Sequence, residues 1–256
     1  MAHPRTYKTE AVVLKQTPLG ETDRILTLFT PDVGKVRAVA RGVRRPKSKL
    51  SGHLELLNQA KVSLSYGRSL DAINEAQSIR SFRGFRDDLQ RISKAIYMAE
   101  LVDGFTIDNS ANYELYLLLV NSLSWLESTD NTDLLLRYFE LHLLEVSGYR
   151  PELVDCVECS TRLEPGDHLF LGSSGGMLCP ECRLTSEESL IPVSLNAMKV
   201  LRFLQRETSF ANVNEFNAPP HILAVLERLN RVYIRYLVER DLKSAEFMNL
   251  VSSTRI

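Results

Sequence analysis

Residues 24–40 have the sequence RILTLFTPDVGKVRAVA, which predicts two β-strands joined by a tight turn. From Lys35 onward, small or apolar residues alternate with basic ones, and a period of two is typical of a strand with one face toward a core. The intervening Pro31-Asp32-Val33-Gly34 contains three residue types that favour turns. We therefore expect Lys35, Arg37 and Arg41 together on one face of the second strand.

Further strand-like runs flank this pair on both sides. They are Thr9–Lys15 before it, and Leu56–Ser65 and Ile73–Ile79 after it. Sequences that contain glycine or proline separate the runs, as turns require. Five short strands in roughly 75 residues fit a small barrel, and the five-stranded OB-fold is the natural candidate. We expect residues 1–80 to form this domain and to bind nucleic acid across one face, as OB-folds do.

Charge is unevenly distributed along the chain. The 256 residues have a formal net charge of -1. Residues 1–80 carry 14 Lys and Arg against 7 Asp and Glu, a difference of +7, whereas residues 81–256 carry 17 against 25, a difference of -8. Such asymmetry suggests that the basic segment meets a polyanion.

The positive charge is concentrated in residues 33–54, which contain no acidic residue. The candidate DNA-binding residues are Lys35, Arg37, Arg41, Arg44, Arg45, Lys47 and Lys49. Pro46 and its like-charged neighbours favour an exposed loop after the strand. A strand face that continues into a basic loop can follow a phosphate backbone, although a merely solvated loop is an alternative. The nearest aromatic residues, Phe29, Tyr66 and Phe82, are expected in the core, so the pattern favours backbone contact over base recognition.

From residue 87 the hydrophobic period becomes helical, and it is strongest between Ile222 and Leu237. We expect residues 81–150 and 191–250 to form one helical bundle, with residues 151–190 as a module inserted in it. The fold class is therefore α+β. One face of the last long helix carries Arg228, Arg231 and Arg235. These arginines either extend the DNA surface or form a solvated face, and the sequence leaves this open.

Four cysteines in two matched pairs mark the inserted module. The pairs are Cys156-Val157-Glu158-Cys159 and Cys179-Pro180-Glu181-Cys182, and the chain has no other cysteine. Each C-x-x-C turn directs two sulfurs at one point, so Cys156, Cys159, Cys179 and Cys182 can complete a tetrahedral site for Zn²⁺. Four thiolates leave no position for water, which predicts a structural ion. Disulfides and a redox dithiol are alternatives. His168 is expected on the surface, not as a further ligand.

No catalytic motif is found in the sequence. It contains no phosphate-binding loop with a lysine, no H-E-x-x-H and no G-x-S-x-G. The run Gly172-Ser173-Ser174-Gly175-Gly176 lacks that lysine and reads as a ribbon turn. No apolar run approaches the ~18–20 residues of a membrane span, and the N-terminus has no apolar core of signal-peptide type. We therefore expect a cytoplasmic protein that is not an enzyme.

Two stretches of the basic segment resemble the bacterial RecO family of DNA-repair proteins. They are LGETDRILTLFT at residues 19–30 and GKVRAVARGVRRPKS at residues 34–48. The order of basic β-barrel, helical bundle and paired C-x-x-C motifs is also similar to that family over nearly the full length. The resemblance implies an N-terminal OB-fold, a helical domain with a zinc module, and DNA contact by the basic residues named above.

The resemblance also implies a function. Members of this family are recombination mediators without catalytic turnover, which bind single- and double-stranded DNA and anneal complementary strands. With RecR they help load the recombinase RecA onto strands coated by single-strand-binding protein, in the pathway that also uses RecF. They contact the acidic tail of single-strand-binding protein through the helical domain. A nucleoid-associated protein is therefore expected, but no residue of this chain is assigned to a partner protein.

Other classes of function remain open at the level of the sequence. A zinc-ribbon transcription or RNA-binding factor would share the basic face but prefer RNA or a defined sequence. A protein-interaction scaffold would grip an acidic partner with the basic loop. A metal-dependent hydrolase would need an open coordination position, and four thiolates argue against one.

Overall fold

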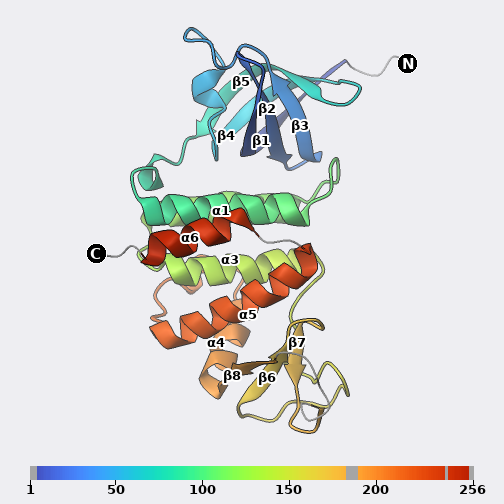
Figure 1. Cartoon of the computed structure of the whole chain (residues 1–256), viewed down its shortest axis with the longest axis vertical. Helices are drawn as coiled ribbons and strands as arrows, with labels where there is room; N and C mark the ends of the chain where they lie inside the picture. Colours follow the sequence, from blue (N-terminus) through green and yellow to red (C-terminus); the bar gives the residue numbers. More distant parts are fainter. Residues whose placement is uncertain (1–4, 183–189, 240–241, 254–256) are drawn as a thin grey trace. The chain divides into compact units, whose positions relative to one another are not determined.

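The computed structural model describes residues 5–182, 190–239 and 242–253 (Figure 1). The chain divides into two compact units, which are residues 1–128 with 243–256, and residues 129–242. The helices that we predicted as one bundle therefore fall into both units, and the predicted domain boundaries stay a prediction. Within the described ranges, no helix has the length and apolar character that a membrane span needs.

Five strands form a closed barrel in the first unit. They are β1 (Thr6–Leu19), β2 (Asp23–Thr30), β3 (Gly34–Ala40), β4 (Gln59–Ser65) and β5 (Asp71–Arg80). Their order around the barrel is β1-β2-β3-β5-β4. The pairing of β3 with β5 is parallel, and the other neighbours are antiparallel. The predicted five-stranded OB-fold barrel is confirmed.

Alternation along the strands places apolar side chains inside the barrel. Val36 and Ala38 of β3 are at most 3% exposed, whereas Arg37 between them is exposed. The register of β1 shifts between Val13 and Lys15, which is a β-bulge. This bulge bends the long strand so that one part pairs with β2 and another with β4.

Helices α1 (Leu89–Phe105) and α2 (Tyr113–Ser128) pack against the barrel within the first unit, and α6 (Lys243–Ser253) packs on α1 (Figure 1). The short 3-10 helix η2 (Arg83–Phe85) precedes α1. Asp88 caps α1, because its carboxylate accepts hydrogen bonds from two backbone N–H groups of the first turn. Gln59 Nε2 donates to Tyr116 Oη at 3.2 Å, and the Tyr116 ring lies 6.1 Å from that of Phe29. The outward side chains of Gln59 and Phe29 are therefore covered by α2.

The second unit combines helices with a small antiparallel sheet. Its elements are α3 (Thr132–Val146), β6 (His168–Leu171), β7 (Gly176–Leu178), β8 (Leu190–Val193), α4 (Leu195–Arg206), the 3-10 helix η4 (Phe210–Asn212) and α5 (Pro220–Val238). The strand order is β7-β6-β8. Gly175, in the turn between β6 and β7, has φ +66°, and a Cβ there would lie 2.3 Å from Tyr233. Only glycine fits this position, so the predicted ribbon turn has a steric reason.

A buried ion pair lies among the helices of the second unit. Arg137 Nη1 is 3.2 Å from Glu140 Oε2, and both side chains are almost fully buried. Asn230 Nδ2 donates to the same oxygen at 2.8 Å. Because Asn230 belongs to α5 and the ion pair to α3, this polar contact joins the two helices. Removing one partner would leave an uncompensated buried charge.

Candidate nucleic-acid interface and metal centre

A basic row crosses the outer face of β1, β2 and β3. Lys15 pairs with Thr27, and Thr27 pairs with Arg37, so the three residues lie side by side across the sheet. Lys15 and Arg37 are exposed. Neighbouring strands are about 4.8 Å apart, which separates the Cα atoms of Lys15 and Arg37 by about 10 Å. The sequence pattern did not indicate Lys15, because the β-bulge that begins at Val13 breaks the alternation of β1.

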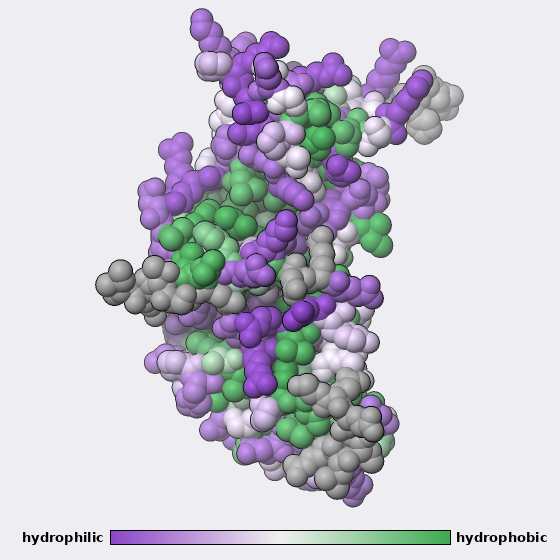
Figure 2. Space-filling view, viewed as in Figure 1, coloured by the Kyte–Doolittle hydropathy of each residue, from purple (hydrophilic) through white to green (hydrophobic). Residues whose placement is uncertain are grey.

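Residues 41–49 form the exposed loop that the sequence predicted. The exposed basic residues of the loop are Arg41, Arg44, Arg45, Lys47 and Lys49. Its backbone is a series of tight turns, since Arg45 N–H donates to Gly42 O at 3.1 Å and Ser48 N–H donates to Arg45 O at 2.9 Å. The loop leaves the barrel at the end away from α1 (Figure 1). Hydrophilic side chains project from this end (Figure 2).

Asp23 fixes the base of this loop. Its Oδ1 accepts hydrogen bonds from Gly42 N–H at 2.7 Å and from Thr22 Oγ1 at 2.8 Å. These two bonds, together with the nearby charges of Arg45 and Arg41, hold the pKa of Asp23 below its ordinary value. The carboxylate therefore stays ionised and positions the loop. The loop keeps a net positive charge, because its arginines and lysines outnumber this one carboxylate.

Lys35 differs from the other candidate residues. Its Nζ donates to Asp103 O at 2.7 Å and lies 3.2 Å from Asp103 Oδ1 and 3.8 Å from Asp108 Oδ1. The side chain is only 12% exposed. Its charge is thus neutralised by α1 and the segment that follows α1, which the sequence pattern around Lys35 could not reveal. Lys35 therefore joins the barrel to α1, and for this reason we leave it out of the DNA surface that we propose.

The aromatic residues that we expected in the core behave differently from one another. Phe29 and Phe82 are buried, as predicted, but Tyr66 is 59% exposed. Tyr66 lies in the turn between β4 and β5, where its ring is 4.7 Å from that of Tyr7. The prediction was wrong for Tyr66, because a turn residue at the end of an alternating strand is not obliged to point inward.

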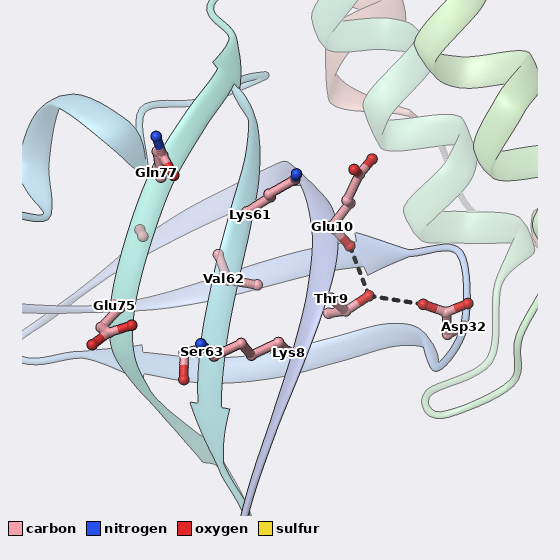
Figure 3. A pocket seen from close by; sticks show the side chains of 10 residues that line it. Lys8, Thr9, Glu10, Asp32, Lys61, Val62, Ser63, Glu75 and Gln77 are labelled. Atoms are coloured by element: carbon pink, nitrogen blue, oxygen red, sulfur yellow. Dashed lines mark hydrogen bonds between the residues drawn. The ribbon is translucent and has the colours of Figure 1, made fainter.

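A groove of about 530 Å³ runs over another part of the barrel surface (Figure 3). Two lysines, Lys8 and Lys61, and three acidic residues, Glu10, Asp32 and Glu75, line it. Carboxylates would repel a phosphate backbone, so this groove is a poor track for nucleic acid. The face with Lys15 and Arg37 is the better candidate.

The arginines of α5 remain a separate surface in the second unit. Arg228, Arg231 and Arg235 are exposed on this helix. Arg231 Nη1 lies 4.0 Å from Glu227 Oε1, an exposed i,i+4 pair of the kind that stabilises a helix only slightly. We therefore leave these arginines out of the DNA surface that we propose.

The four cysteines come together in the second unit. The sulfurs of Cys156, Cys159, Cys179 and Cys182 all lie within 4.8 Å of one another. The Sγ atoms of Cys159 and Cys179 are 3.7 Å apart, which is too far for a disulfide. Two thiolates on a tetrahedral zinc ion, with Zn–S bonds of about 2.3 Å, would be about 3.8 Å apart. The cluster therefore has the donor atoms and the size that such an ion requires.

Hydrogen bonds within the cluster shift the pKa values of individual thiols in opposite directions. Cys179 N–H donates to Cys156 Sγ at 3.3 Å, and Cys182 N–H donates to Cys179 Sγ at 3.5 Å. Hydrogen bonding to the Thr161 hydroxyl and backbone lowers the pKa of Cys159 to about 6. The hydrogen bonds that Cys182 shares with Cys159 and Cys179 instead raise the pKa of Cys182. Closely spaced thiols that share protons in this way are typical ligands for a metal that displaces those protons.

His168 is not among the clustered residues, in agreement with the expectation that it is no ligand. It is, however, buried, which corrects the expected surface position. Its Nε2 is 2.8 Å from Glu164 O, a contact within the loop that leads into β6. This backbone contact gives the imidazole a structural role in the module.

Comparisons with known proteins agree on one family. Residues 1–82 match the family described as Recombination protein O N terminal, and residues 86–246 match Recombination protein O C terminal. The DNA repair protein RecO of Dehalococcoides mccartyi is 40% identical over 256 residues, which cover 100% of each chain. The RecO of Roseiflexus sp. is 38% identical over 96% of this chain and 86% of its own. The RecO of Symbiobacterium thermophilum is 35% identical over 97% of this chain and 99% of its own.

Proposed function

The chain belongs to the RecO family of DNA repair proteins, and from this premise we propose that it is a recombination mediator that acts by binding DNA, without catalytic turnover. The observation that carries the proposal is the exposed basic surface of the barrel. This surface, termed the basic barrel face, consists of Lys15, Arg37, Arg41, Arg44, Arg45, Lys47 and Lys49. Single- and double-stranded DNA both offer the phosphates that such a face attracts.

The basic barrel face suits contact with the phosphate backbone. Its cations are long, exposed side chains on a strand row and an adjacent loop, and Asp23 is the acid that anchors this loop. The loop arginines and lysines follow one another closely along the chain, so several can reach successive phosphates of one strand. Contacts of this kind hold a strand without reading its sequence.

Annealing follows from the same physics. Two complementary strands repel each other through their phosphates, and cationic side chains that neutralise some of those phosphates lower this repulsion. Because contacts to the backbone leave the base edges free, the bound strand can still pair with its complement. The chain would thereby anneal strands and help load the recombinase RecA onto strands coated by single-strand-binding protein. RecR would be its partner, with a functional link to RecF, in the nucleoid of the cytoplasm.

The cysteine cluster supports a structural Zn²⁺ ion. Cys156, Cys159, Cys179 and Cys182 supply four soft sulfur ligands, which favour zinc over magnesium or calcium. When bound, the ion would cross-link the two C-x-x-C turns and leave no coordination position for a substrate. Its role would be to hold the shape of the module that precedes β8 and α4.

A salt titration of DNA binding tests the proposal. Fluorescence anisotropy of a labelled single strand of mixed sequence would be measured over a series of salt concentrations. If four to six phosphates are neutralised, log K falls with log[salt] with a slope of roughly -3 to -4. A second strand of unrelated sequence should bind equally well. Absence of binding at low salt, or a flat response to salt, would contradict the proposal.

A further inference from the structure

The turn between β4 and β5 is held in one conformation by the side chain of Asp71. Asp71 Oδ1 accepts a hydrogen bond from Gly67 N–H at 3.0 Å, across the turn. Tyr66 N–H donates to Arg5 O at 3.2 Å, which ties the start of the turn to the residue just before β1. A Cβ at Gly67 would lie 1.8 Å from Leu70 O, so the turn is too tight for another residue there. The backbone that carries Tyr66 is therefore fixed.

The same aspartate also fixes the ring on which Tyr66 rests. Tyr7 Oη donates to Asp71 Oδ2 at 2.6 Å. The rings of Tyr7 and Tyr66 have centroids 4.7 Å apart and planes 30° apart, so one face of Tyr66 is covered by Tyr7. Burial and the bond to Asp71 raise the pKa of Tyr7, which keeps its hydroxyl protonated and able to donate. With 59% of Tyr66 exposed, much of its remaining surface is open to solvent.

The turn adjoins the basic barrel face. The turn ends at Asp71, the first residue of β5, and Asp71 pairs with Ala38 of β3. Ala38 directly follows Arg37 in the sequence. Arg68 in the turn and Arg5 beside it are exposed, and each adds a cation near Tyr66. An exposed aromatic ring among cations is the arrangement by which OB-folds hold single strands, and the loop between the last two strands is one of their binding elements.

We propose that Tyr66 stacks on a base of a bound single strand and makes the site prefer single-stranded over double-stranded nucleic acid. A base in a single strand can expose its face to the ring, whereas a base inside a duplex is already stacked on both sides. The rigid support from Tyr7 and Asp71 means that little conformational freedom is lost when the base binds. The inference deepens the proposed function and rests on it, because it adds a base contact to a site otherwise built for phosphates.

The experiment compares Tyr66→Ala, Tyr66→Phe and the control Tyr113→Ala in the full chain. Tyr113 is also 59% exposed but lies at the start of α2. Each variant would be titrated with a mixed-sequence single strand, with an abasic strand of the same length, and with the corresponding duplex, over a salt series. Thermal melts would establish that every variant is folded.

Tyr66→Ala is expected to weaken binding to the normal single strand by at least about fivefold, the low end for the loss of one base–aromatic stack. Its affinity for the abasic strand and the duplex, and its salt slope, should match the wild type. Tyr66→Phe should retain binding because it keeps the ring, and Tyr113→Ala should behave as the wild type. Unchanged single-strand binding by Tyr66→Ala, or an equal loss on the abasic strand, would overturn the stacking role and leave the proposed function intact. Failure of the wild type to bind any of the three would refute the proposed function itself.

Discussion

Replacing Lys15 and Arg37 together by glutamine removes the cationic row from the outer face of the barrel. Both side chains are exposed, and they flank Thr27 across the sheet. Among the residues that the structure describes, no hydrogen bond is found for the side chain of Lys15 or Arg37. Replacing them by glutamine should therefore leave the fold intact. The double variant Lys15→Gln/Arg37→Gln therefore tests the DNA surface with little effect on the fold.

The size of the effect follows from counterion release. Each phosphate contact on a single strand contributes about -0.7 to the slope of log K against log[salt]. Loss of two contacts should make the slope about 1.4 less negative. Between 1 M and 0.1 M salt, each contact therefore raises the binding constant by a factor of about 5. Without two contacts, the double variant should bind about 25-fold more weakly than the wild type at 0.1 M salt.

The assay is the anisotropy titration of a labelled single strand at five or more salt concentrations. Lys8→Gln/Lys61→Gln is the matched control, because it also removes two exposed lysines from the barrel, but from the groove that Glu10 and Glu75 share. The control should keep a slope close to that of the wild type. Equal losses in the two double variants would show that only net charge matters, and an unchanged slope in Lys15→Gln/Arg37→Gln would refute the assignment of the basic row.

Three further predictions concern stability. Removal of the metal by a chelator, or Cys156→Ser, should lower the melting temperature by at least about 5 °C, because the cross-link between the two turns is lost; an unchanged melt after verified metal removal would oppose a structural role. Glu140→Ala should cost about 3–5 kcal/mol in urea denaturation, since it leaves Arg137 buried without its partner, and a cost below about 1 kcal/mol would contradict this. The pKa of Asp23 is lowered in the folded state, so its contribution to stability is present above its unfolded pKa and is lost as the pH falls through the folded pKa. Asp23→Asn should flatten the dependence of the melting temperature on acidic pH, and an unchanged dependence would speak against this anchor.

Local pattern was enough to predict the barrel, because five alternating runs separated by turn residues leave few other architectures. The bounds were less accurate. Leu56–Asn58 lies outside β4, and Leu57 has φ +68°, a conformation that a strand does not allow. β1 extends beyond the predicted run to Leu19, because its bulge lets a single strand serve two neighbours. Such features depend on tertiary pairing.

For the candidate sites, too, local sequence spacing was predictive, whereas contacts between residues far apart in the chain were not. The cysteine cluster was predicted correctly as a group, since two C-x-x-C spacings by themselves specify which sulfurs converge. Lys35 looked equivalent to Arg37 in the sequence, but its partner Asp103 is 68 residues away and becomes a neighbour only in the fold. Lys15 was missed because a β-bulge that the sequence does not reveal sets its place in the sheet. Tyr66 was wrongly expected in the core, because the alternation of a strand does not determine where a residue in the following turn points.

A strand-annealing assay tests directly whether the basic barrel face gives this protein its proposed function. Two complementary oligonucleotides that carry a donor and an acceptor dye would be mixed with the wild-type chain, and the rate of duplex formation would be followed by energy transfer. We expect faster annealing with the protein than without it, and we expect this acceleration to weaken as salt rises. It should be clearly reduced in Lys15→Gln/Arg37→Gln but not in Lys8→Gln/Lys61→Gln. Strands that are bound by the protein but anneal no faster than free strands would contradict the proposed function.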